Sequence, residues 1–200
     1  MKNPITLIIY IIIICFSGCA TNKQLEKEEY QLLLSYRNRG LAYIEEEQYL
    51  DAVKQFKSFI DIAPFEASGY ANLGWACLQL PNKLDSAEIY LLEAEELSQG
   101  NSDIVFMVAK MYELSDRNLA ATERLHSIID NRPDHVMSLY QLSEFYRISS
   151  KAEDLIQSEK LLSQILQVVP GNIAAHLKFV DLSIKTINGT FLIGHNIYKT

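Results

Sequence analysis

The sequence predicts an all-α protein in which antiparallel helix hairpins stack into an α-solenoid. Apolar residues recur at spacings of three and four, which is typical of helices with one buried face. Pro and Gly fall between these segments, where helices end. One pattern of small and large residues also returns about every 34 positions. A repeat of this length indicates hairpins that bury their apolar faces only by stacking on their neighbours.

Residues 1–18 are predicted to be a secretory signal peptide. A short start with one positive charge precedes an almost unbroken apolar run over residues 5–16. The small residues Ser17 and Gly18 then stand directly before Cys19, as at a signal cleavage site. The apolar run is shorter than the roughly 20 residues that span a bilayer. The alternative is an N-terminal anchor that is never cleaved.

The motif Phe-Ser-Gly-Cys, which ends at Cys19, resembles the lipobox of bacterial lipoproteins. Phe16 departs from the Leu, Val or Ile that is usual at its position. The resemblance implies that cleavage precedes Cys19 and that this residue carries the lipid. It also implies three acyl chains, which attach a protein stably, whereas one chain binds only marginally. Ala20 stands where an Asp would favour the inner membrane, so we expect an outer-membrane location facing the periplasm.

Charge and cysteine content exclude several kinds of partner and crosslink. The chain has 18 Lys and Arg against 25 Asp and Glu, and its formal net charge is −7. This balance, without a basic run, argues against nucleic-acid binding and against electrostatic docking on anionic lipid. Cys15 would leave with the signal peptide and Cys19 would be lipidated, so Cys77 has no cysteine left to pair with. We expect packing alone to hold the fold.

A repeat domain is expected over residues 30–187, after a linker over residues 19–29. Its first unit places six residues at regular positions: Tyr36, Gly40, Tyr43, Ala52, Phe56 and Pro64. This unit resembles the tetratricopeptide repeat (TPR), which reads W-x2-L-G-x2-Y, then A-x3-F, then P. The resemblance implies two antiparallel helices in each unit.

The later units repeat the pattern with defined departures. The second unit has Tyr70, Leu73, Gly74, Cys77 and, after one inserted residue, Ala87, Leu91 and Ala94, with Gln99 in place of Pro. The third unit has Val105, Val108, Ala109, Tyr112, Ala121, Leu125, Ile128 and Pro133. The fourth unit has Leu139, Leu142, Ser143, Tyr146 and, after three extra residues near 149–151, Ser158, Leu162, Ile165 and Pro170. We expect a fifth first helix over residues 173–187 and an irregular tail over residues 188–200.

The residue types fit the geometry of stacked hairpins. Small residues such as Gly40 and Ala52 stand where the two helices of a hairpin cross closely. Large residues such as Tyr43 and Phe56 fill the space between one hairpin and the next. Pro64 ends the second helix because proline cannot continue a helix interior. The alternative, a helical bundle with chance spacing, does not account for several units in one register.

No catalytic or metal-binding constellation stands out. The histidines lie far apart in the sequence: His126, His135, His176 and His195. There is no H-x-x-x-H motif, Gly-rich phosphate loop or G-x-S-x-G elbow. The carboxylate runs at residues 45–47 and 93–96 are typical of solvated helix faces. Cys77 occupies a repeat position that predicts a buried, inert thiol. We expect no metal, no cofactor and no enzyme activity.

The first helices of such a solenoid are expected to line a concave groove that binds proteins. The register places nine side chains there: Arg37, Leu41, Asn72, Trp75, Phe106, Lys110, Tyr140, Glu144 and Arg147. Trp75, Phe106 and Tyr140 recur once per unit, and aromatic residues are frequent interface anchors. Packing of these rings against their neighbours is the alternative. Asp103 and Met107 stand where the carboxylate clamp of chaperone-binding TPR proteins has cations, so capture of a C-terminal carboxylate is not expected.

These features together predict a membrane-anchored scaffold for protein–protein interaction. Such a scaffold would assemble or stabilise an envelope complex, such as a pilus or a secretion apparatus. The lipobox, the short linker, the consecutive units and the inserted residue in the second unit resemble the type IV pilus pilotin class. TPR lipoproteins of β-barrel assembly and peptidoglycan coordination share most of this layout. The alternative is a periplasmic ligand- or glycan-associated protein whose aromatic groove holds sugar or lipid.

Overall fold

The computed structural model describes residues 26–149 and 151–184, and every regular element within them is a helix. The complete helices are α2 (Lys27–Glu45), α3 (Tyr49–Ile62), α4 (Ala67–Leu78), α5 (Leu84–Leu97), α6 (Ser102–Leu114), α7 (Asn118–Asn131), α8 (Val136–Ile148) and α9 (Ala152–Val168). A further helical segment covers residues 173–184. The expected signal peptide, Cys19 and the tail over residues 188–200 lie outside the described residues.

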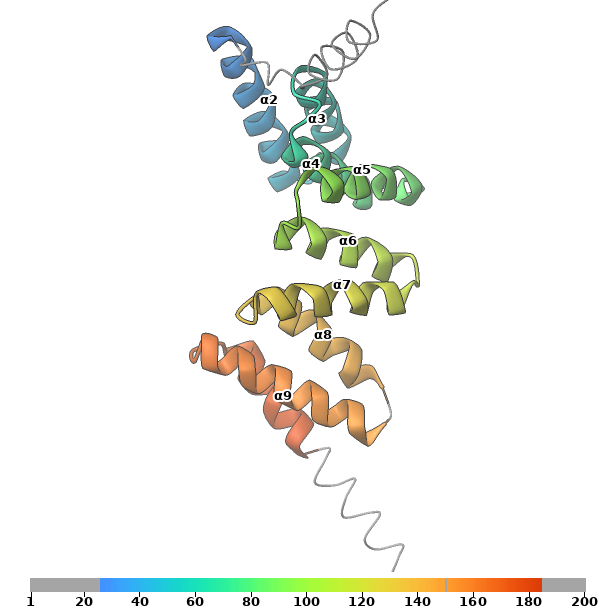
Figure 1. Ribbon diagram of the computed structural model, residues 1–200, viewed down its shortest axis with the longest axis vertical. Coiled ribbons are helices and arrows are strands. Elements are labelled where there is room, and N and C mark those ends of the chain that lie inside the picture. The colour runs from blue at the N-terminus through green and yellow to red at the C-terminus, as the bar shows by residue number, and fades with distance from the viewer. Residues whose placement is uncertain (1–25, 150, 185–200) are drawn as a thin grey trace, which may run out of the picture.

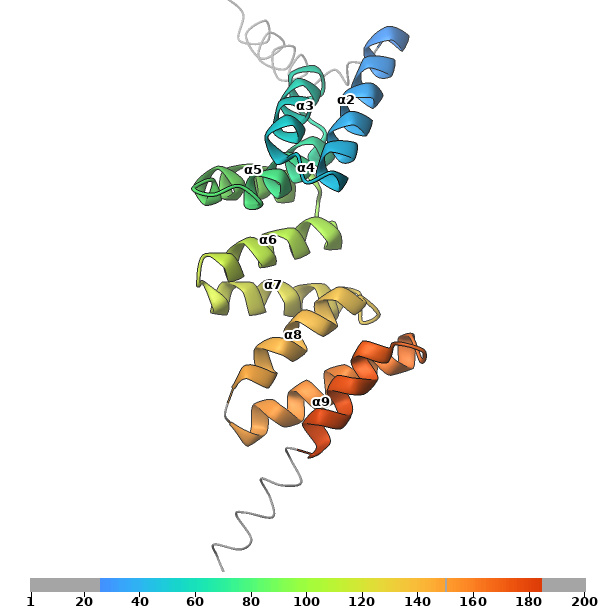
Figure 2. The ribbon, with the colours of Figure 1, turned by 180° about the vertical axis from the view of Figure 1, so that it is seen from behind.

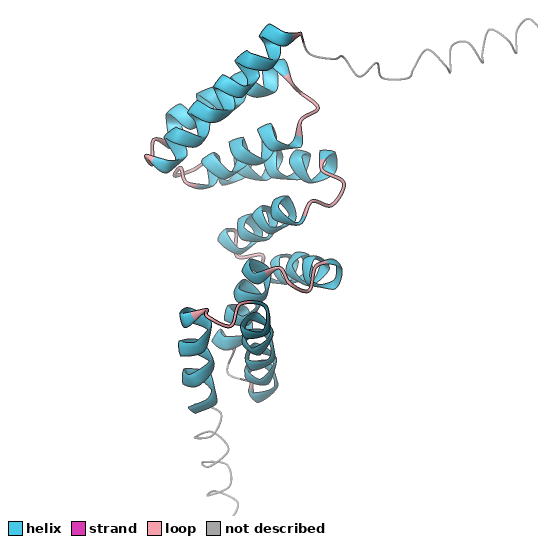
Figure 3. Cartoon of the chain, turned by 90° about the vertical axis from the view of Figure 1, so that its left-hand side faces the viewer, coloured by secondary structure: helices cyan, strands magenta, loops and turns pink. Residues whose placement is uncertain are grey.

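Consecutive helices pair as hairpins, and the hairpins stack into an elongated solenoid. The pairs α2–α3, α4–α5, α6–α7 and α8–α9 follow one another along the long axis (Figures 1 and 2). Seen from the side, successive hairpins are rotated relative to one another (Figure 3). The predicted fold class is therefore confirmed.

Small residues allow the two helices of each hairpin to approach closely. Ala52 of α3 is fully buried, as are its counterparts Ala87 and Ala121. A Cβ atom added at Gly40 would lie 2.5 Å from Cε1 of Phe56, which is too close for any rigid neighbour. The predicted role of these positions is therefore confirmed.

Large residues connect each hairpin to the next. Phe56 of α3 is fully buried and packs with Leu73 and Cys77 of α4. Leu125 of α7 packs in the same way with Leu142 of α8. These contacts form a chain of small cores along the stack, as the repeat pattern predicts.

The turn after the second hairpin forms without the proline that follows the first and third hairpins. Pro64 and Pro133 stand directly after α3 and α7, one residue beyond the helix cap. At the equivalent position Gln99 takes a left-handed conformation with a φ of 53°, and Gly100 follows with a φ of 89°. Two left-handed residues therefore replace the proline turn, and glycine adopts such a φ without steric cost.

Two boundaries differ from the sequence-based expectation. Helix α2 begins at Lys27, before the expected domain boundary at residue 30, and the Glu26 backbone N–H donates to the Glu29 carboxylate at its start. The three extra residues of the fourth unit were expected near 149–151. The structure incorporates them into α9, which has 17 residues, whereas α3, α5 and α7 have 14 each. Three residues add almost one helical turn.

Candidate functional site

The first helices of successive hairpins form the inner side of the stack. Helix α4 contacts both α2 and α6 directly, whereas successive second helices approach one another less closely in the described part of the chain. A solenoid curves toward the helices that are closest together. The faces of α2, α4, α6 and α8 therefore line the candidate binding surface.

The nine predicted groove residues all lie on these four helices. Arg37 and Leu41 on α2 are exposed. The remaining seven are partly exposed: Asn72, Trp75, Phe106, Lys110, Tyr140, Glu144 and Arg147. Their partial exposure is compatible with a binding surface, and their role in binding remains a prediction.

Phe106 lies between the groove and the core. Its ring centroid is 6.0 Å from that of His135, and its side chain packs against the cluster around Leu142. His135 is only 5% exposed, and its Nδ1 accepts a hydrogen bond from the backbone N–H of Ser138. The other ring nitrogen lies 3.2 Å from Oδ1 of Asp103, so it carries the proton and donates to that carboxylate. Much of the Phe106 side chain therefore packs against its neighbours, as the alternative interpretation of the groove aromatics predicts.

Lys110 belongs to a polar triangle that joins α6 to α8. Its ammonium group pairs with the Glu113 carboxylate and donates to Oε1 of Gln141 at 3.3 Å. The Gln141 amide in turn donates to Oε1 of Glu113 at 2.8 Å. The charge of Lys110 is therefore matched within the protein.

Glu144 joins α8 to the helical segment over residues 173–184. Nη2 of Arg147 donates to its carboxylate at 2.7 Å, and Lys178 pairs with the other carboxylate oxygen. The Lys178 ammonium also lies 4.6 Å from the centroid of the Tyr140 ring, within cation–π range. Tyr140 and Glu144 therefore contact the next repeat.

The electrostatics of this cluster favour its charged form. Burial by itself would raise the pKa of Glu144, but the hydrogen bonds from Arg147 and Lys178 outweigh it and hold the pKa below its ordinary value. Burial would likewise lower the pKa of Lys178, and the interactions with Glu144 and Tyr140 outweigh that effect and raise it. The charges of Glu144 and Arg147 in the groove near α8 are thus matched by ion pairs within the protein.

The groove near α2 and α4 offers groups that are still available. Arg37 and Asn72 make no hydrogen bond or ion pair with side chains in the part of the chain that the structure describes. Trp75 and Leu41 add apolar surface at the equivalent position of successive units. This half of the inner face therefore combines apolar, cationic and amide groups without an internal partner.

Three residues that pair with groove side chains were not predicted from the sequence. They are Lys178, Gln141 and Glu113. Lys178 lies 34 residues after Glu144, but the three extra residues of the fourth unit move the equivalent position of the next repeat to residue 181. The repeat spacing therefore predicts neither the Lys178 pair nor the bridging role of Gln141.

The described histidines have local structural partners. His126 shares a hydrogen bond of 3.0 Å with the Tyr146 hydroxyl, and Nε2 of His176 donates to the carbonyl of Pro170 at 2.8 Å. His195 lies outside the described residues. No group of three or more metal-ligating side chains converges within residues 26–149 and 151–184. Cys77 is buried, and burial raises the pKa of its thiol, which disfavours the reactive thiolate.

None of the helices in the described ranges combines the length and the apolar character that a bilayer span requires.

Comparison with known proteins places the geometry among TPR structures. No family model matches the chain. The human protein O-mannosyl-transferase TMTC3 is 28% identical over 124 residues, which are 62% of this chain. The chain spans 13% of the length of that relative.

Three solved structures illustrate the shared fold. Pseudomonas aeruginosa PilF superposes with a TM-score of 0.69 at 16% identity, over 81% of this chain and 72% of that one. MamA from Desulfovibrio magneticus gives 0.64 at 13% identity, over 84% and 92%. YrrB, described as a TPR protein with an unusual peptide-binding site, gives 0.58 at 19% identity, over 73% and 74%. The hairpin stack described here is thus the fold of TPR proteins.

Proposed function

We propose, from the TPR fold of the chain, that it is a protein-interaction scaffold whose concave groove holds a segment of a partner protein. The observation that carries this proposal is the contrast between the two halves of the groove. Charged residues near α8 are matched within the protein, whereas Arg37, Asn72 and Trp75 are exposed or partly exposed and have no polar side-chain partner among the described residues. We therefore assign the binding centre to α2 and α4.

The chemistry of this centre suits an extended or helical peptide. The Asn72 side chain offers both a donor and an acceptor, which match a backbone N–H and carbonyl. Trp75 offers a large apolar face, and tryptophan is among the residues that most often dominate binding energy at interfaces. Arg37 adds a cation for an acidic group on the partner. A glycan would use the same rings, and it is the rival that the experiment separates.

We extend the proposal to the cell envelope. A lipid on Cys19 would attach the scaffold to the outer membrane, facing the periplasm, where it would serve the assembly of an envelope complex such as a pilus. The lipobox resemblance and the apolar run over residues 5–16 support the anchor. The fold shared with PilF accords with this setting.

Substitution of Trp75 by Ala tests the binding centre. A partner is first identified by crosslinking in cells, and its affinity for the purified chain is then measured. We expect Trp75→Ala to weaken binding by about thirtyfold or more, equivalent to about 2 kcal/mol, with little change in the urea midpoint. Phe106→Ala is expected instead to lower stability by about 3 kcal/mol, because that ring packs on the core.

Leu50→Ala is the matched control, since Leu50 is 63% exposed on the second helix α3. Unchanged affinity in Trp75→Ala would contradict the proposed centre. Parallel losses of stability and of binding in Trp75→Ala would mean that Trp75 acts as a core residue. Capture of a glycan in place of a protein would favour the rival function.

A further inference from the structure

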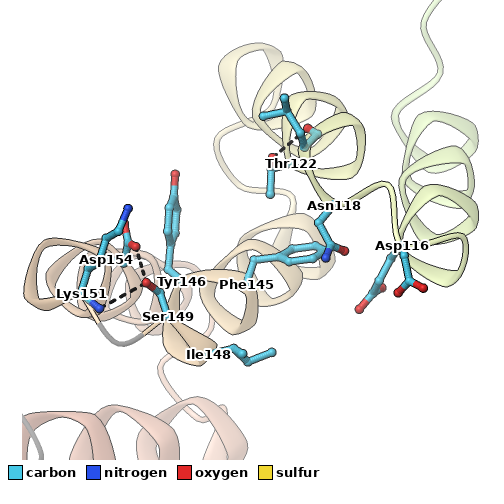
Figure 4. A pocket seen from close by; sticks show the side chains of 11 residues that line it. Asp116, Asn118, Thr122, Phe145, Tyr146, Ile148, Ser149, Lys151 and Asp154 are labelled. Carbon is cyan, nitrogen blue, oxygen red and sulfur yellow. Dashed lines mark hydrogen bonds between the residues drawn. The ribbon is translucent and has the colours of Figure 1, made fainter.

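A cleft of about 800 Å³ opens between the third and fourth hairpins. Its lining residues come from the end of α6 and the start of α7 on one side, and from the end of α8 and the start of α9 on the other. The cleft therefore lies at the edge of the stack where the turns within hairpins are found (Figures 1 and 4). None of the nine predicted groove residues lines it.

The two turns that border the cleft have different backbone geometry. In the turn after α6, Asp116 is left-handed with a φ of 57°, and the Arg117 N–H donates to the Tyr112 carbonyl at 2.9 Å. At the end of α8, Ser149 is extended with a ψ of 142°. The longer helix α9 then places Asp154 in its first turn. The additional turn of α9 thus supplies one wall of the cleft.

Large apolar side chains face the cleft without cover. Leu119 on α7 and Ile148 on α8 are each 75% exposed, and both line this volume. Phe145 and Ile148 point from α8 toward the side formed by the start of α7 (Figure 4). Single exposed leucines are ordinary, but apolar side chains gathered around one concave volume are typical of binding sites.

Carboxylates border the cleft on both sides. Asp116 makes no hydrogen bond or ion pair through its carboxylate within the described residues. Asp154, which accepts a hydrogen bond from the Ser149 hydroxyl, lies on the opposite side (Figure 4). Glu113 is matched by Lys110, and Lys151 is the cation among the residues that line this volume. The unmatched charge of the cleft is therefore negative.

We propose that this cleft docks a partner segment in which Lys or Arg residues flank large apolar side chains. The apolar middle packs against Leu119, Phe145 and Ile148. The flanking cations face Asp116 and Asp154, which lie on either side of Phe145 and Ile148 (Figure 4). The volume is within the range of about 300–1,000 Å³ that is usual for small binding sites. The surface is separate from the groove on α2 and α4, so it does not depend on the proposed function.

A synthetic peptide tests this inference on the full chain. The probe is a fluorescein-labelled peptide in which lysines flank a Leu-Phe-Leu core, and its control has glutamates in place of the lysines. We expect the lysine peptide to bind more tightly than the glutamate peptide, and less tightly as salt is added. Leu119→Glu is expected to weaken binding by about tenfold or more. Asp116→Asn is expected to weaken it about threefold at low salt, and Asn tolerates the left-handed φ.

Ile89→Glu on α5 is the matched control, because Ile89 is 67% exposed and lies away from the cleft. Urea midpoints of all variants establish that they are folded. Equal binding of the two peptides, or full binding by Leu119→Glu, would overturn the proposal. Loss of peptide binding in Trp75→Ala with retention in Leu119→Glu would also overturn it, by placing the peptide in the concave groove. If the wild-type protein is a dimer that Leu119→Glu dissociates, the face is a contact between two copies of the chain. That outcome would also overturn the proposal.

Discussion

Single atoms decide how closely the helices of a hairpin approach. The Cα of Gly40 faces the Phe56 ring, and the Cβ of any other residue would have to displace that ring. In the second unit, a Cβ at Gly74 would lie 2.6 Å from Cγ of Leu91 and 3.2 Å from its backbone nitrogen. Movement of the Phe56 ring can relieve the contact at Gly40. The contacts at Gly74 include the backbone nitrogen of Leu91, which cannot move aside in the same way. Gly74 therefore tolerates substitution less well than Gly40.

Ala52 provides a residue-scale test of the same geometry. Its side chain is fully buried at the helix crossing, so Ala52→Leu should overpack the hairpin and cost about 1–3 kcal/mol of stability. Lys54→Leu, two residues away, should be nearly silent because the Lys54 side chain is 70% exposed and its ion pair with Asp51 is on the surface. Urea unfolding measures both. Equal midpoint shifts would mean that the assigned register is wrong.

At the scale of elements, ion pairs join α8 to the helical segment over residues 173–184. The side chains of Glu144 and Lys178 are 19% and 31% exposed, so solvent screens their interaction only partly. Removing Glu144 would take away the carboxylate that Arg147 and Lys178 share, while Asp181 would remain as an acidic neighbour of Arg147. This carboxylate therefore adds an electrostatic contact to the apolar packing of Ala175 and Leu182 against the stack.

Glu144→Gln tests this contact through its pH dependence. The folded state holds the pKa of Glu144 below its ordinary value, so its stabilisation is present above that ordinary value and is lost as the pH falls through the folded one. At pH 7 we expect Glu144→Gln to cost about 1–2 kcal/mol. At an acid pH below the folded-state pKa the wild-type carboxyl is protonated, so the difference from Gln should become small.

Urea unfolding at both pH values measures the change. Glu123→Gln is the control, because it removes a carboxylate from an exposed position on α7. A cost of Glu144→Gln that is the same at both pH values would contradict the charged role of this residue.

At the scale of the whole molecule, each surface of the stack is formed by a defined stretch of the chain. Each hairpin packs mainly on its neighbours, so a local change in one hairpin alters one stretch of surface. The additional turn of α9 changes the edge between the third and fourth hairpins, and the groove on α2 and α4 lies in the first two. The proposed anchor precedes the whole array. The two proposed binding surfaces and the proposed membrane attachment would therefore act separately.

The anchor is tested by Cys19→Ser. A lipobox cysteine is the attachment point of the lipid, so the variant should accumulate as a larger, unprocessed precursor that a fatty-acid probe does not label. Gel mobility and metabolic labelling in the native host measure these two properties. Trp75→Ala serves as the control, since it should be processed and labelled normally. Normal labelling of Cys19→Ser would contradict the proposed anchor.

The sequence by itself determined the helices, their pairing and the residues at each crossing. The 3.6-residue period of a helix is a local property, so the spacing of Gly40, Ala52 and Phe56 predicts which side chains meet within a hairpin. The same periodicity assigned the groove positions to the first helices. The start of α9 was not predicted, since the sequence pattern placed the three extra residues of the fourth unit near 149–151, whereas the structure extends α9 with them.

Only the tertiary structure decided which groove residues are matched within the protein and where the cleft opens. The pairing of Glu144 with Lys178 depends on the distance between helices that belong to different repeats. The approach of Asp116 and Asp154 from opposite sides depends on the direction in which two turns leave their helices. Sequence spacing specifies position along one helix, whereas distances between helices are set by the packing of all side chains between them.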